Sequence, residues 1–210
     1  LAKEYGFESL AITDLNVMHG ALKFYNECKK NNIKPIIGLH LEYTYNDQVS
    51  SLLLYATNMF GYKNLMKLSS QAKISGKPVD LDFLAKCNVG VIAIIPTFEN
   101  VIGFYLKNHL DKEAISHLSL LKTILSQVYI GVTMLTQEDK EQFSYIYAFA
   151  KNRNIEIVAV NIMKMDYIGV VFLDFLNKFF CCRCGIKALT VSNSGKHTVN
   201  FNIQVGADSV

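Results

Sequence analysis

The chain has 210 residues, of which 50% are hydrophobic and 19% charged, and its formal net charge is +3. This composition, with only 3 prolines and 12 glycines, excludes a disordered chain and predicts one domain with a real core, with or without an irregular tail. So mild a charge does not by itself indicate nucleic-acid binding. We interpret three lysine pairs as solvated helix faces: Lys29 and Lys30, Lys63 and Lys67, Lys73 and Lys77.

Short apolar runs and amphipathic stretches alternate along residues 8–160. In chain order they predict strands at 9–13, 35–45, 51–56, 89–95, 128–133 and 155–160, and helices at 20–30, 61–73, 81–86, 112–126 and 137–152. Asn46 and Asp47 indicate a turn, and Thr136 is a good N-cap. Repeated strand–helix units predict a parallel α/β fold, either open or closed into a barrel.

The pattern changes after residue 165. Residues 167–182 are apolar, but this run is too short for a membrane helix and three polar residues interrupt it. Residues 191–196 resemble a loop, and residues 198–205 alternate as one half-exposed strand. We therefore predict a domain over residues 1–165 and a divergent or irregular tail over 166–210. Because Leu1 opens the chain inside a predicted helix, we expect a fragment that has lost its true N-terminus.

The chain has five cysteines, Cys28, Cys87, Cys181, Cys182 and Cys184. An odd number, mostly in one cluster, argues against a disulfide framework and favours the reducing cytoplasm. The last three contain a C-x-x-C spacing without a second pair, whereas a structural zinc site needs four ligands. Residues 194–198 depart from the phosphate-loop pattern at two required positions. His19, His109, His117 and His197 lack a partner motif and are interpreted as surface or core histidines.

Parallel α/β folds form their sites at the carboxyl ends of strands. The polar residues predicted there are Asp14, His40, Glu42, Ser51, Thr97, Glu99 and Lys164. A cluster of two or three metals needs several convergent His and carboxylate ligands, which only Asp14, His40, Glu42 and Glu99 could supply. Asp14 fits a turn or helix cap equally well.

Three blocks in order make a specific resemblance to a known family. Residues 10–25 (LAITDLNVMHGALKFY) are similar to an "AxTDxxxxxGAxxFY" segment, residues 33–38 (IKPIIG) follow, and residues 54–69 (LYATNMFGYKNLMKLS) resemble "LLAxNxxGYxNLxxLxS". All three are typical of the polymerase-and-histidinol-phosphatase (PHP) domain in bacterial DNA polymerase III alpha subunits, especially the short Gram-positive type. The resemblance covers residues 1–165.

This resemblance implies a distorted β/α barrel, here incomplete because the first strand with its His-x-His motif is missing. We expect the resulting open sheet edge to make the isolated chain poorly soluble. In some family members the strand ends hold metals and support phosphoester hydrolysis or proofreading. At the corresponding positions this chain has Leu15, His40, Ser51, Thr97, Gly131 and Lys164. The resemblance therefore implies a degenerate metal site without catalytic residues, in which only Asp14 and His40 are vestigial ligand positions.

The function implied is that of a structural or interaction module within a replicative polymerase. Its partners would be the polymerase core domains of the same parent chain and, through the parent, replisome subunits and DNA, with no membrane partner. No cofactor is expected here, since the parent's Mg²⁺ binds a palm domain outside this chain. One alternative is a phosphoesterase or 3′–5′ exonuclease that holds Zn²⁺ or Mn²⁺ with His40, Glu42 or Glu99. Another is a stand-alone phosphatase of the histidinol-phosphate type. Direct DNA contact by this segment stays open.

Overall fold

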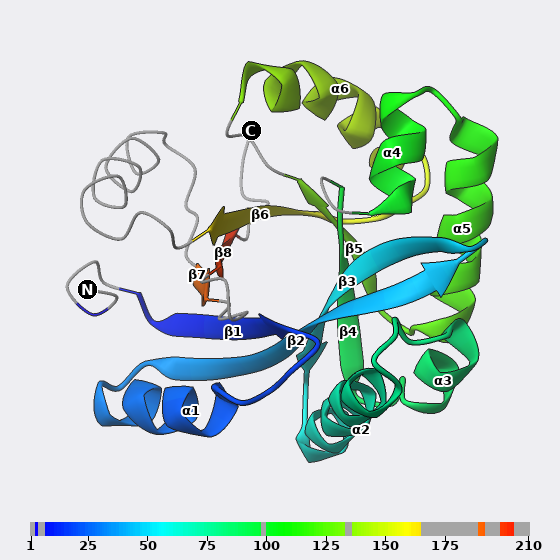
Figure 1. Cartoon of the computed structure of the whole chain (residues 1–210). Coiled ribbons are helices and arrows are strands. Elements are labelled where there is room, and N and C mark those ends of the chain that lie inside the picture. The colour runs from blue at the N-terminus through cyan, green and yellow to red at the C-terminus, as the bar shows by residue number, and fades with distance from the viewer. Residues whose placement is uncertain are drawn as a thin grey trace.

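A computed structural model describes residues 3, 7–97, 100–132, 136–164, 189–191 and 198–203 (Figure 1). For Glu138, for residues 161–164 and for the last two ranges, it describes the backbone only. The predictions made for Glu99, for residues 167–182 and for the clustered cysteines lie outside the described residues. Of the loop predicted at 191–196, only Val191 is described, and it belongs to a strand. The boundary after residue 165 stays a prediction.

One curled sheet organises the described part of the chain. Its strands are β1 (Ser9–Leu15), β2 (Lys34–Tyr45), β3 (Gln48–Ala56), β4 (Val91–Pro96), β5 (Val128–Val132), β6 (Ile157–Lys164), β7 (Leu189–Val191) and β8 (Thr198–Ile203). The order across the sheet is β7-β1-β2-β3-β4-β5-β6-β8. Strands β1 to β6 curl into a half-barrel (Figure 1), which confirms the predicted α/β fold of the barrel type.

The two tail strands extend both ends of this half-barrel. β8 pairs antiparallel with β6, and β7 pairs in parallel with β1 over Leu10, Ala11 and Ile12. The resemblance predicts an open sheet edge. Over these three residues the edge is therefore covered rather than open, which removes part of the reason for expecting poor solubility.

Six helices cover the convex side of the sheet in the described part (Figure 1). They are α1 (Ala21–Lys30), α2 (Met59–Ser75), α3 (Leu81–Lys86), α4 (Val101–Lys107), α5 (Asp111–Ile124) and α6 (Gln137–Lys151). Every helix predicted from the sequence is present, with ends displaced by two residues at most. The predictions missed α4, although Asn100 caps it with a side-chain acceptor for the Ile102 amide, 2.8 Å away.

The predicted parallel α/β fold is correct except at β3, which makes the sheet mixed. β3 runs antiparallel to both β2 and β4, whereas β1 with β2, β4 with β5 and β5 with β6 are parallel pairs. Only Asn46 and Asp47 join β2 to β3, and both have left-handed backbone angles (φ 48° and 60°). Two residues with left-handed backbone angles form a hairpin turn whose twist matches that of antiparallel strands. A parallel pair would need a crossover connection of a dozen or more residues, so a two-residue link excludes it.

Each strand presents alternate residues to two different cores. On the convex outer face, Leu39, Leu54 and Ile95 pack with helix residues such as Leu65 and Leu118. On the concave inner face, a smaller cluster contains Ala11, Leu53, Tyr55, Ile94 and Val160. A side chain at the strand ends therefore faces either the helices or the interior of the half-barrel, and which one depends on its parity along the strand.

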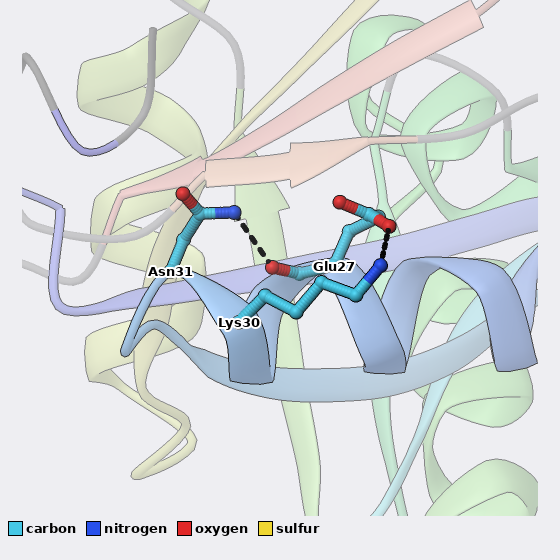
Figure 2. A network of polar contacts seen from close by, with 3 residues as sticks. All are labelled: Glu27, Lys30 and Asn31. Atoms are coloured by element: carbon cyan, nitrogen blue, oxygen red, sulfur yellow. Dashed lines mark hydrogen bonds and ion pairs between the residues drawn. The ribbon is translucent and has the colours of Figure 1, made fainter.

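Local capping fixes the helix ends. Figure 2 shows the carboxyl end of α1, where Lys30 Nζ lies 2.7 Å from Glu27 Oε1 and Asn31 Nδ2 donates to the Glu27 carbonyl at 2.9 Å. Asn32 then turns the chain with φ 56°. At the start of α6 the predicted cap is confirmed: Thr136 Oγ1 accepts from the Asp139 amide, and Asp139 Oδ2 accepts from the Thr136 amide. Such a capping box satisfies two helix donors at once.

Candidate functional site

The strand ends bring most of the candidate positions to one place on the inner face. β1 and β2 are in parallel register with Leu15 opposite His40, and Glu42 lies opposite Ser51 on the antiparallel β3. Paired residues point to the same face, and Leu39 and Leu41 on either side of His40 belong to the outer core. Leu15, His40, Glu42 and Ser51 therefore share the inner face at one end of the half-barrel.

Asp14 lies on the opposite face of the sheet. It is paired in register with Leu39, an outer-core residue, and its Oδ2 accepts a hydrogen bond from the Gly20 amide at 3.3 Å, just before α1 begins. A Cβ on Gly20 would lie 3.0 Å from the same carboxylate oxygen, so the Asp14 carboxylate packs closely against the Gly20 backbone. Asp14 and His40 thus point to opposite faces of the sheet, and the Asp14 carboxylate holds the loop ahead of α1.

His40 is buried at its place on β2. The residue is 7% exposed, and burial lowers its pKa to about 4. Removing a histidine from water penalises the imidazolium form, so the ring is neutral at physiological pH. A neutral imidazole can ligate a metal, but a metal site of this family type needs further ligands around it.

Glu42, a carboxylate on the inner face, is held by Asn16. Asn16 Nδ2 donates to Glu42 Oε2 at 2.7 Å, and the Glu42 amide donates to Asn16 Oδ1 at 2.9 Å. The Asn16 amide in turn donates to the His40 carbonyl at 2.8 Å. Sequence reasoning missed Asn16. Its left-handed backbone (φ 57°) at the end of a strand is a conformation that Asn adopts more readily than other non-glycine residues.

Two more of the candidate positions tie β4 to β5. Thr97 donates to the Gly131 carbonyl twice, from its backbone amide at 3.0 Å and from Oγ1 at 2.8 Å. A Cβ placed on Gly131 would lie 2.7 Å from Val160 Cγ2 and 2.8 Å from Ile94 Cγ2. The space that a longer side chain would need at Gly131 is therefore filled by the apolar inner core.

The described residues do not form a metal centre. Among them, no group of three His, Cys, Asp or Glu side chains is arranged to hold a metal ion. Glu99 and the side chain of Lys164 lie outside the described residues. Cys28 and Cys87 are buried free thiols far apart in sequence.

A small hollow lies between the ends of β4 and β5 and helix α6. Its lining includes Thr97, Val132, Asp139, Gln142 and Phe143, and its volume is about 40 Å³. Such a volume accommodates a water molecule or two, whereas small-molecule sites usually measure about 300–1,000 Å³. This hollow is too small for a substrate.

The most elaborate polar cluster in the described chain is on the outer face. Tyr43 Oη and His117 Nε2 are 2.9 Å apart, and Asn100 Nδ2 donates to Tyr43 Oη at 3.3 Å and to the Ser51 carbonyl at 2.6 Å. His117 is fully buried and stacks on the Tyr45 ring at 3.6 Å. Burial lowers the His117 pKa to about 4 and raises the Tyr43 pKa to about 12.

This cluster joins the β2–β3 hairpin to α4 and α5. The Val101 amide donates to Ser50 Oγ at 3.2 Å, which adds a further tie between α4 and the hairpin. Tyr43, Asn100 and His117 are buried on the helix-covered side of the sheet, so we interpret the cluster as structural. The interpretation of His117 as a core histidine agrees with its burial.

Comparison with known proteins identifies the family. The model of the PHP domain matches residues 1–156. The DNA polymerase III subunit alpha of Streptococcus pyogenes serotype M3 (strain ATCC BAA-595 / MGAS315) is 38% identical over 96 residues, which are 46% of this chain and 9% of that protein. The corresponding subunit of Staphylococcus aureus (strain Mu50 / ATCC 700699) is 31% identical over 166 residues, which are 75% of this chain and 15% of that protein.

A solved structure shares the fold. A protein from Bifidobacterium adolescentis, assigned as a metal-dependent phosphoesterase, superposes with a TM-score of 0.50 over 75% of this chain and 78% of its own. At 10% sequence identity the likeness concerns the fold alone. The chain spans no more than 15% of the length of the two polymerase subunits compared above. With its match over residues 1–156 and its relatives among Gram-positive polymerase subunits, the chain belongs to the PHP domain family.

Proposed function

We propose that this chain is the PHP segment of a replicative DNA polymerase III alpha subunit and acts there as a structural module without hydrolytic activity. One observation carries the proposal: the inner face, where the family places its ligands, is packed with apolar side chains at Gly131. Two more observations support the proposal. Asp14 points to the helices instead of the interior, and the Glu42 carboxylate is hydrogen-bonded to Asn16.

Within the parent protein, the module would pack against the polymerase core domains of the same polypeptide. Replisome subunits and DNA would be partners of the parent, whose Mg²⁺ belongs to a palm domain outside this chain. The proposal places the protein in the cytoplasm. No helix in the described residues is long and apolar enough to cross a membrane.

The experiment is metal analysis of the purified 210-residue chain after exhaustive dialysis, together with a phosphodiesterase assay in added Zn²⁺ or Mn²⁺. We expect less than about 0.1 equivalent of retained metal and no hydrolysis above buffer. Retention of one or more equivalents would overturn the structural role. A primer-extension assay of the same sample should show no synthesis.

An enzyme with an altered ligand set is the second candidate. It is favoured by one observation, namely that His40 and Glu42 share the inner face two residues apart on β2. If this candidate is right, His40→Ala must abolish both metal retention and hydrolysis. Asp14→Ala, on the other face, must leave both unchanged.

A further inference from the structure

Helix α2 exposes a stripe in which lysines and large apolar residues are mixed. Its solvent side carries Lys63, Lys67 and Lys73 together with Phe60, Met66 and Ile74, here called the α2 stripe. These six positions follow helical spacing, and the opposite side of α2 buries Leu65, Leu68 and Ala72 in the outer core. Phe60 is 71% exposed and Ile74 is 85% exposed, so the stripe is uncovered in this chain.

The charge of the stripe is of one sign. Helix α2 contains no acidic residue, and none of its three stripe lysines forms an ion pair with another described residue.

The interleaving of the two residue kinds restricts what could cover the stripe. A helix that lies on a membrane has its apolar residues on one face and its lysines on the other, whereas here both kinds share one face. Lysine is depleted from the centres of protein–protein interfaces. Surfaces that bind single-stranded nucleic acid combine cations along the phosphates with aromatic and apolar groups against the bases. From Lys63 to Lys73 the helix rises about 15 Å, enough to follow several nucleotides.

We propose that the α2 stripe is a docking surface for single-stranded DNA. The inference rests on the proposed function, because it deepens the role of the module within a DNA polymerase. The lysines neutralise backbone phosphates, and Phe60 supplies a ring on which a base stacks. This changes the interpretation of Lys63, Lys67 and Lys73 as merely solvated, because the sequence did not show that Phe60 and Ile74 stand exposed beside them.

The test is fluorescence anisotropy of a labelled 20-nucleotide single strand with the full 210-residue chain, from 20 to 200 mM NaCl. The triple variant Lys63→Gln, Lys67→Gln, Lys73→Gln should bind at least about tenfold more weakly at 50 mM salt, and the slope of log K against log salt should become shallower by about 2. The matched control is Lys23→Gln, Lys29→Gln, Lys30→Gln on α1. It removes the same charge from exposed positions and should leave the slope unchanged. Phe60→Ala should weaken binding about tenfold at an unchanged slope.

Three results would overturn the proposal. The first is that the unsubstituted 210-residue chain shows no saturable binding to the single strand. The others are that the two triple variants lose the same affinity for DNA, or that the unsubstituted chain binds poly-glutamate as tightly as DNA. Binding to vesicles with anionic lipids but not to DNA would do the same. Thermal melting followed by circular dichroism confirms that the variants are folded, since all the substituted side chains are exposed. The DNA-binding result is independent of the metal analysis. Retained metal would contradict the structural role without affecting the DNA-binding result, and a lack of DNA binding would leave the structural role standing.

Discussion

Asn16 and Glu42 hold each other through reciprocal hydrogen bonds between the end of β1 and the middle of β2. The Asn16 side-chain amide donates to the Glu42 carboxylate at 2.7 Å, and the Glu42 backbone amide donates to Asn16 Oδ1 at 2.9 Å. The Asn16 carbonyl also accepts from Ser69 Oγ of α2 at 3.2 Å. The loop after β1 is thereby fixed to both its strand neighbour and a helix.

Asn16→Ala should lower the free energy of unfolding by about 3 kcal/mol, as measured by urea denaturation. About 2 kcal/mol comes from the two side-chain hydrogen bonds, and about 1 kcal/mol from placing alanine at φ 57°. Asn16→Gly keeps the backbone relaxed and should lose the hydrogen-bond part alone. Asn46→Ala is the matched control, since Asn46 has φ 48° in an exposed turn and should cost only about 1 kcal/mol. Equal losses at Asn16 and Asn46 would show that the Glu42 bonds contribute nothing.

Gly131→Ala should destabilise the protein by about 1–3 kcal/mol, because the new methyl group would overlap Val160 and Ile94. The measurement is a double-mutant cycle with Val160→Ala, in which the cost of the alanine at 131 should shrink by at least about 1 kcal/mol. If the two substitutions are additive, the inner face is not filled at this point. The same crowding should make Gly131→Glu, with its larger side chain, more destabilising than Gly131→Ala.

Asn100→Ala should lower the unfolding free energy by about 3 kcal/mol. The substitution removes the cap of α4 and leaves the Ser51 carbonyl and the Tyr43 hydroxyl short of a buried donor. Asn100→Asp keeps the acceptor for the Ile102 amide but cannot donate, so it separates the cap from the buried bonds. The control at the other end of the same helix is Asn108→Ala, whose exposed bond to the Phe104 carbonyl should matter by less than about 0.5 kcal/mol.

Stability should fall as the pH drops from 7 to 5, by about 2 kcal/mol for each of His40 and His117. Burial holds both folded pKa values at about 4, whereas an unfolded histidine titrates near 6.5. Between these values the unfolded chain binds more protons than the folded chain, so protonation favours unfolding. Below about pH 4 both states are protonated, and this contribution stops changing.

Urea denaturation at pH 7 and pH 5 measures this effect. His117→Gln should remove about half of the pH dependence while keeping a side chain that can bond to Tyr43. His19→Gln is the control, because His19 is exposed and should leave the dependence intact. An unchanged pH dependence in His117→Gln would show that His117 is not held neutral by its burial.

Local patterns in the sequence determined most of the elements and the family. Apolar periodicity located every helix of the described residues except α4, since positions along one element repeat at its own period whatever surrounds it. Asn100 ahead of an apolar run was the signal for α4 that went unused. The two-residue turn at Asn46 and Asp47 likewise predicts that β3 runs antiparallel to β2, because so short a link permits only an antiparallel pair.

Only the tertiary structure decided what faces what at the candidate site. The sequence shows that Asp14 and Leu15 are neighbours and therefore point to opposite faces, but not which of them meets His40. The register of β1 against β2 sets that pairing, and it gives Leu15 to the inner face and Asp14 to the helices. In the same way the sequence shows a glycine at 131, and only packing across three strands shows that Val160 and Ile94 fill its space. Register and packing depend on contacts between residues far apart in the chain, which no local pattern encodes.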